Sequence, residues 1–146
     1  LGTGDESYER IFSNLASRNG NKARALIKFD RGLSKHLYAS ADLFLMPSKS
    51  EPCGLSQMIA CAYGTIPIVR AVGGLYDSIM PYGAAGSNGF QFNNFNAHEM
   101  LFKIKDALGV YYNKPEWDAL VQRAMHTDFT WKKSAEKYLE IYKSLF

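Results

Sequence analysis

Cysteine is scarce in this chain of 146 residues, which contains only Cys53 and Cys61. They fall at the two ends of one expected helical segment, where about eight residues of helix would hold them roughly 12 Å apart, too far for a disulfide. The sequence has no C-x-x-C pair and no histidine cluster, so we expect no metal site. Unpaired cysteines are typical of a reducing compartment and predict a cytoplasmic protein.

Long apolar runs are also missing. None approaches the roughly 20 residues that a membrane-spanning helix requires. The chain begins with Leu1-Gly2-Thr3-Gly4-Asp5, which lacks the basic and apolar regions of a signal peptide. It also lacks an initiating methionine, and we therefore expect a piece of a longer polypeptide.

Charge of one sign is not concentrated anywhere. The formal net charge is +3, and lysine and arginine are spread along the chain. That distribution argues against a nucleic-acid-binding surface. The mild positive balance suits an anionic small ligand, and a solvated surface explains it equally well. A hydrophobic fraction of 47% and a charged fraction of 21% are typical of a globular protein, and we interpret residues 1–146 as a single domain.

Several common nucleotide-binding and hydrolase motifs are absent. No G-x-G-x-x-G or G-x-x-x-x-G-K-[ST] follows an expected strand, which disfavours a standard dinucleotide site or a P-loop. There is no Ser-His-Asp set and no nucleophile elbow. His36, His98 and His126 stand alone in the sequence and are interpreted as surface or helix-end residues.

Strands alternate with helices over about the first ninety residues, which predicts a parallel sheet, and the chain beyond is helical. We therefore expect an α/β fold: a Rossmann-like three-layer domain with a mainly parallel sheet and a helical C-terminal region. The expected strands are residues 23–29, 41–46, 65–70 and 89–92. The expected helices are residues 6–18, 32–40, 54–63, 75–80, 98–112, 115–126 and 130–145.

Four of these helices carry apolar residues at helical spacing, which are typical of helices that pack against a core. The members are, in residues 6–18, Tyr8, Ile11, Phe12 and Leu15; in residues 54–63, Leu55, Met58, Ile59 and Ala62; in residues 98–112, Met100, Leu101, Ile104, Leu108 and Tyr111; and in residues 130–145, Ala135, Tyr138, Leu139 and Tyr142. Asp5 and Asp30 precede the first two helices and are expected to cap them.

The run 41–46 is interpreted as a buried strand, and it leads into Pro47 and a loop with an acid, Glu51, and a glycine, Gly54. A strand that ends in such a loop and then opens a helix can bind a phosphorylated sugar. The first amides of the helix and its positive dipole end can hold a phosphate, and the acid can hold a sugar hydroxyl.

Three features follow expected strands on the same rim of the sheet: Phe29, the loop 51–57, and Gly73-Gly74. Ligands of such sheets bind at this rim. An aromatic face, an acid, helix-start amides and closely approaching glycines together suit a nucleotide with a diphosphate and a polar head group. Taken singly, each has a structural explanation: a core ring for Phe29, an exposed loop acid for Glu51, a small half-buried side chain for Cys53, and a tight turn for the glycines.

Five segments carry a resemblance to a known family. They are Pro-Ser at 47–48, Glu-Pro-Cys-Gly-Leu-Ser-Gln at 51–57, Tyr-Gly-Thr-Ile-Pro-Ile-Val-Arg at 63–70, Gly-Gly-Leu-Tyr-Asp-Ser at 73–78 and Asp-Phe-Thr-Trp at 128–131. With these motifs in order, nearly the whole chain resembles the carboxyl-terminal region of bacterial glycogen synthases and plant starch synthases. These are retaining glycosyltransferases of the GT-B type, with two Rossmann-like domains.

The resemblance implies an activity. The full-length enzyme would transfer glucose from ADP-glucose to the non-reducing end of an α-1,4-glucan with retention, in the cytoplasm or, in a plant, the plastid. No metal, cofactor, protein nucleophile, nucleic acid or membrane is implied, and amides and cations would stabilise the leaving diphosphate.

The resemblance also assigns residues. Glu51 would be the catalytic residue that contacts the donor glucose hydroxyls and orients the sugar. Phe29 would stack on the adenine, backbone amides would hold the sugar or diphosphate, and two glycines would let the backbone approach the donor. The implied donor-binding residues are Phe29, Cys53, Gly54, Leu55, Ser56, Gly73 and Gly74.

The chain departs from the family pattern at Ala71-Val72, where the family has Lys or Arg followed by Thr. The family's phosphate-binding Arg and Lys and its acceptor-binding domain lie outside the chain, so we expect the chain alone to be inactive. Two other interpretations stay open: a non-catalytic module that binds a nucleotide sugar or a glucan, and a related retaining transferase with another sugar nucleotide. ADP and UDP also stay open, since Phe29 would stack on either base.

Overall fold

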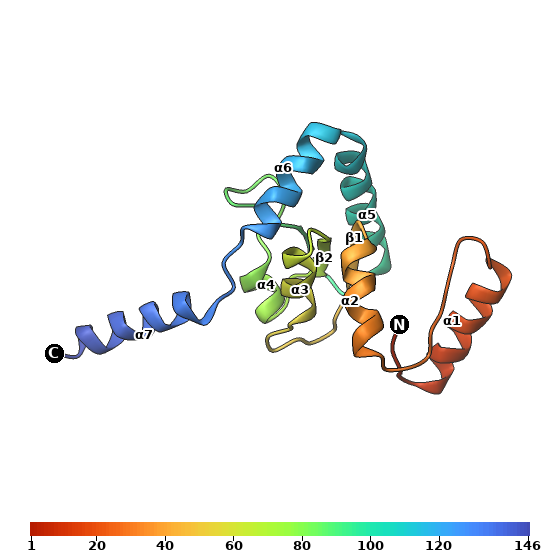
Figure 1. Ribbon diagram of the computed structural model, residues 1–146, viewed down its shortest axis with the longest axis horizontal. Helices are drawn as coiled ribbons and strands as arrows, with labels where there is room; N and C mark the ends of the chain where they lie inside the picture. The colour runs from red at the N-terminus through yellow and green to blue at the C-terminus, as the bar shows by residue number, and fades with distance from the viewer. The chain divides into compact units, whose positions relative to one another are not determined.

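The computed structural model describes residues 1–146 and divides into two compact units, Leu1–Leu37 and Tyr38–Phe146 (Figure 1). Helix α2, Arg31–Ser40, contains the boundary between them. The predicted cap of this helix is confirmed, because the Leu33 amide donates to Asp30 Oδ1 at 2.9 Å.

The first unit is built around helix α1, Glu6–Arg18, whose bounds and cap are as predicted: the Ser7 amide donates to Asp5 Oδ1 at 3.1 Å. The expected strand 23–29 is wrong. Only one isolated parallel bridge joins Ile27 to Gly2, because a strand needs a neighbouring backbone over several residues and Gly2 alone supplies one. Helix α1 has no buried residue, and each of its four stripe side chains is more than half exposed.

The second unit contains a three-stranded sheet with the order β1-β2-β3 and parallel pairing throughout. Its strands are β1 Leu43–Met46, β2 Ile66–Arg70 and β3 Phe90–Phe92. Ile68 in the middle of β2 pairs with Leu45 on one side and Phe90 on the other. The predicted α/β fold and parallel sheet are confirmed.

Strand β2 is the centre of the core. All of its residues except Arg70 are buried, as expected for the middle strand of a parallel sheet that is covered on both faces. The buried apolar side chains packed around it are Cys61, Leu75, Ile79, Phe90, Phe92, Ala107, Trp117, Leu120 and Ala124. The run 41–46 does contain a strand, but its interpretation as buried is wrong, because β1 lies at an edge of the sheet and its residues are half-buried or, at Leu45, exposed.

Four helices complete the packed part of this unit: α3 Ser56–Ala62, α4 Gly74–Ser78, α5 Ala97–Tyr112 and α6 Lys114–Met125. Helix α3 contacts β1, β2 and α6, and α5 contacts β2, β3 and α6. The predicted apolar face of α3 is wrong: its buried residues are Gln57, Ala60 and Cys61, whereas Leu55 before it is 67% exposed. The small Ala60 and Cys61 let α3 lie close to the sheet, and this nonlocal fit outweighs the local stripe.

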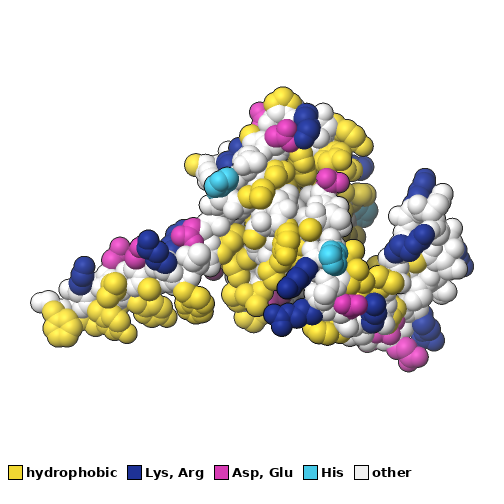
Figure 2. Space-filling model, in the orientation of Figure 1, with side chains coloured by type: hydrophobic (Ala, Val, Ile, Leu, Met, Phe, Trp, Pro, Cys, Tyr) yellow, Lys and Arg dark blue, Asp and Glu magenta, His cyan; other side chains and the backbone are white.

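Helix α7, Trp131–Ser144, extends away from the sheet and buries none of its residues (Figure 1). Apolar side chains line one side of it and charged side chains lie on the other (Figure 2). None of the seven helices is long and apolar enough to cross a membrane.

Candidate functional site

The loop between β1 and α3 is held by the last residue of β2. The guanidinium of Arg70 donates to the carbonyl oxygens of Ser48 at 3.3 Å and Lys49 at 2.8 Å, and also to that of Asn93 at 3.2 Å. Its Cζ atom lies 5.7 Å from the centre of the Phe95 ring. One arginine thus fixes the backbone that leads into Glu51.

Glu51 and the amides that follow it are available to a ligand. The half-buried carboxylate of Glu51 forms no hydrogen bond or ion pair within the chain. The backbone amides of residues 53–56 likewise have no acceptor in the chain. An unpaired acid beside a run of free amides can bind a sugar hydroxyl and an oxyanion, which is the chemistry that the sequence predicts here.

Gly73 and Gly74 bring a second loop against the first. The Gly74 amide donates to the carbonyl oxygens of both Glu51 and Pro52, each at 3.2 Å. A Cβ atom on Gly73 would overlap the Glu51 carbonyl oxygen, and one on Gly74 would overlap the backbone of Cys53. Gly73 also has a φ of +49°, in the left-handed region that favours glycine. The structure therefore explains both glycines by the contact between two loops, and their approach to a donor stays a prediction.

Hydrogen bonds of the Gln57 side chain also link the same two loops. It is fully buried, and its Nε2 donates to the carbonyl oxygens of Cys53 at 3.1 Å and Gly54 at 2.9 Å. The same nitrogen lies 3.1 Å from Ser78 Oγ, which in turn donates to the Gly74 carbonyl oxygen at 2.6 Å. Sequence reasoning included Gln57 in a motif without giving it a role, because its partner Ser78 is 21 residues away.

A pocket of about 450 Å³ opens beside these loops and is lined by Cys53, Gly74, Ser78 and residues from 127–134, among others. Glu51 does not line it. The structure therefore brings Cys53 and Gly74 together at one pocket and places the acid outside it.

Phe29 belongs to the first unit, whereas the loops 51–57 and 73–74 belong to the second. Phe29 is 88% exposed, so its interpretation as a core residue is wrong. Its stacking on a base stays a prediction.

The two cysteines have opposite environments and are both free, as predicted. Cys61 is buried in the core, and that burial raises the pKa of its thiol to about 12. Cys53 is exposed on the loop. Only Cys53 can contact a ligand through its side chain.

The loops and the parallel sheet coincide with a family match. Residues 2–116 match the family described as Glycosyl transferases group 1. The chain belongs to the group 1 glycosyl transferases. The predicted resemblance to glycogen synthases is also confirmed, since the chain is 49% identical over 147 residues to the glycogen synthase of Clostridium novyi (strain NT).

Solved glycosyl transferases share the fold. The chain matches the catalytic domain of starch synthase IV from Arabidopsis thaliana, bound to ADP and acarbose, with a TM-score of 0.87 and 35% identity over 98% of this chain. It matches the sucrose-phosphate synthase of Thermosynechococcus elongatus with a TM-score of 0.65 and 23% identity over 99% of this chain, a likeness of fold.

This chain corresponds to part of each larger relative. It spans 31% of the C. novyi glycogen synthase, 31% of the starch synthase IV chain and 37% of the sucrose-phosphate synthase chain.

Proposed function

We propose that this chain is the donor-binding part of a glycogen or starch synthase. The full-length enzyme transfers glucose from ADP-glucose to the non-reducing end of an α-1,4-glucan with retention of configuration. The likeness to a starch synthase catalytic domain bound to ADP and acarbose carries the proposal, because ADP is the nucleoside diphosphate that ADP-glucose releases on transfer.

The geometry of the loops supports a division of roles. The unpaired carboxylate of Glu51 orients the donor glucose by accepting hydrogen bonds from its hydroxyls. The free amides of residues 53–56 hold the diphosphate and stabilise the charge that develops on it as the glycosidic bond breaks. Phe29 stacks on the adenine, and Gly73 and Gly74 give the donor access to the loop backbone. The donor is a substrate, and the reaction needs no metal or organic cofactor.

The binding site for the acceptor glucan requires residues outside this chain, so the chain alone is inactive. With its two free thiols, the enzyme works in the cytoplasm, or in the plastid of a plant.

The test is a turnover measurement on the full-length protein with ADP-glucose and glycogen. Glu51→Gln keeps the size of the side chain and is expected to lower kcat by about a hundredfold or more, because orientation and charge at the donor are lost. Asp118→Asn, a matched change at an exposed acid of α6, should leave kcat within about twofold. A Glu51→Gln enzyme that works as fast as the wild type would remove Glu51 from the mechanism.

A non-catalytic binding module is the second candidate, and Ala71-Val72 favours it. Ala71 uses its amide in a bond to the Phe92 carbonyl oxygen at 2.8 Å, and Val72 packs against the core, so neither supplies a cation or a hydroxyl. Titrating ADP-glucose, UDP-glucose and glycogen into the full-length protein separates the candidates. Binding of the first with glucose transfer supports the synthase, binding without transfer supports the module, and a preference for UDP-glucose indicates another transferase.

A further inference from the structure

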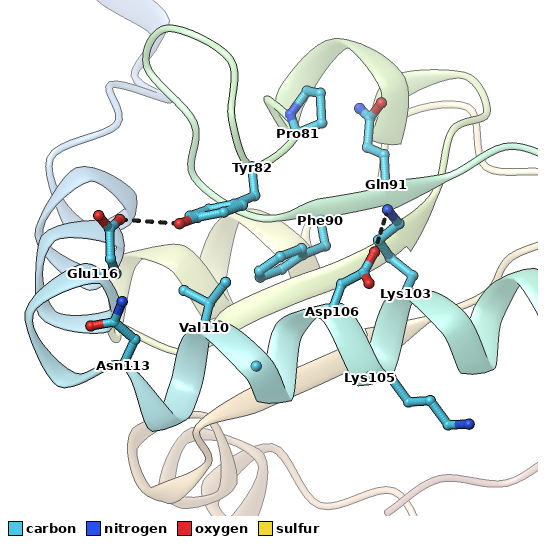
Figure 3. Close-up of a pocket in the computed structure, with 11 residues that line it drawn as sticks. Pro81, Tyr82, Phe90, Gln91, Lys103, Lys105, Asp106, Val110, Asn113 and Glu116 are labelled. Atoms are coloured by element: carbon cyan, nitrogen blue, oxygen red, sulfur yellow. Dashed lines mark hydrogen bonds and ion pairs between the residues drawn. The ribbon is translucent and has the colours of Figure 1, made fainter.

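A second pocket lies apart from the donor loops, between the start of the 81–89 loop, strand β3, helix α5 and the first turn of α6 (Figure 3). Its volume is about 540 Å³. It shares no lining residue with the loops 51–57 and 73–74. Its main lining side chains are Tyr82, Phe90, Lys103, Asp106, Asn113 and Glu116.

The ring of Tyr82 is held rigidly in this pocket. It stacks on Phe90 with 5.4 Å between the ring centres and 24° between the planes. Its hydroxyl donates to Glu116 Oε2 at 3.0 Å, and this bond raises the pKa of Tyr82. The side chain is still 37% exposed. A fixed, partly open aromatic ring loses little conformational entropy when a ligand packs on it.

Gly109 leaves the floor of the pocket open. It lies inside α5, where glycine weakens a helix, and neither a left-handed φ nor a close contact requires it. A Cβ atom at this position would meet nothing within 4 Å. Packing and backbone geometry therefore do not explain this glycine, and its visible effect is the open space above the helix.

The polar groups around the pocket balance in charge. Lys103 Nζ lies 2.9 Å from Asp106 Oδ2, and Glu116 is bonded to Tyr82 (Figure 3). Lys105 points away in Figure 3, with its Nζ 5.9 Å from the Phe102 ring. The side-chain amide of Asn113 forms no hydrogen bond within the chain and can both donate and accept. Paired charges with spare hydrogen-bonding capacity favour a neutral ligand with many hydroxyls over an anion or a cation.

We propose that this pocket binds a neutral oligosaccharide, namely a segment of α-1,4-glucan away from its reacting end. A glucose unit packs its C–H face on the electron-rich face of Tyr82, while its hydroxyls bond to Asn113 and to the free carboxylate oxygens of Asp106 and Glu116. The choice of an α-glucan rests on the proposed function, and the pocket holds the polymer without taking part in transfer.

The experiment titrates maltoheptaose into the chain without nucleotide and follows backbone NMR shifts. Shifts are expected at Tyr82, Asn113 and Glu116 and not at the 51–57 loop. Gly109→Leu fills the floor and replaces a helix-weakening residue, so it should raise Kd by about tenfold or more without lowering Tm. Phe102→Gln removes an exposed ring of α5 outside the pocket and should leave Kd unchanged.

Three results would overturn the proposal: unchanged affinity in Gly109→Leu, shifts confined to the 51–57 loop, or binding that is lost as NaCl rises and is competed by inorganic pyrophosphate. The donor role is tested separately by the turnover of Glu51→Gln. Maltoheptaose can therefore bind this pocket in a protein that does not use ADP-glucose, and a working synthase can fail the maltoheptaose test.

Discussion

Helices α6 and α7 are adjacent in the chain, have 12 and 14 residues, and were both predicted from the sequence. Their surroundings in the structure are opposite: α6 is packed and α7 is exposed. Helix α6 buries Trp117, Leu120 and Ala124 against the rest of its unit, and Trp117 makes an edge contact with Tyr111 at 5.1 Å. Helix α7 buries nothing, and Leu139 in its stripe is 56% exposed.

This difference separates two properties that an apolar stripe is often taken to combine. The stripe predicts that a segment is helical and which side of it is apolar. Whether that side is covered depends on where the neighbouring elements lie. Helix α6 follows α5 after a single residue, Asn113, and turns back onto α5 and α3, whereas α7 follows the longer segment 126–130.

The largest expected effect comes from replacing one leucine in each helix. Leu120→Ala leaves a cavity in the core and should lower the free energy of unfolding by about 2–5 kcal/mol. Leu139→Ala removes the same atoms from an exposed face and should change it by less than about 0.5 kcal/mol. Urea unfolding followed by circular dichroism measures both. Equal losses would show that α7 is packed in solution.

A buried polar residue should have an intermediate effect. Gln57→Met keeps the approximate size of the side chain but removes the hydrogen bonds to Cys53, Gly54 and Ser78. It should cost about 1–3 kcal/mol of unfolding free energy, because carbonyl oxygens are left without a donor. Gln122→Met in α6, whose side chain forms no hydrogen bond, is the control and should be nearly neutral. A neutral Gln57→Met would show that water replaces these bonds.

Two glycines extend the contrast between packed and open positions. Replacing each of them by alanine should have a smaller effect on stability, and the two effects should have opposite signs. Gly109→Ala adds a methyl group to open space inside α5 and should stabilise the chain by up to about 1 kcal/mol. Gly73→Ala forces a Cβ onto the Glu51 carbonyl oxygen and should destabilise it. Thermal unfolding compares the pair, and a gain in Tm for Gly73→Ala would contradict the close contact of the loops.

The smallest effect concerns the start of a helix. Hydrogen bonds from the Asn94 side chain and from the amides of Asn94 and Asn93 hold the pKa of Glu99, at the start of α5, below its ordinary value of 4.5. Because the pKa is lower in the folded state, these hydrogen bonds contribute fully to stability above pH 4.5. That contribution is lost as the pH falls through the pKa of the folded state. NMR titration should show the Asn94 amide shifting below pH 4.5, and Glu99→Gln should abolish that shift.

The sequence was most informative where structure is local. The bounds of α1 and the caps Asp5 and Asp30 follow from neighbours within a few residues, and the strand–loop–helix around Glu51 was located by the same kind of signal. The buried face of α3 and the edge position of β1 depend on contacts with distant segments, which a periodic pattern does not contain. The bond between Gln57 and Ser78 belongs to this second kind.

The contact between the loops 51–57 and 73–74 also has a mechanical consequence. The Gly74 amide is shared between two carbonyl oxygens of the first loop, Gln57 and Ser78 brace the same junction, and no side chain fits between the backbones. The two loops are therefore rigid relative to each other and cannot close on a ligand by moving independently. Any opening or closing of a donor site built here must come from domains that rotate about segments away from this junction.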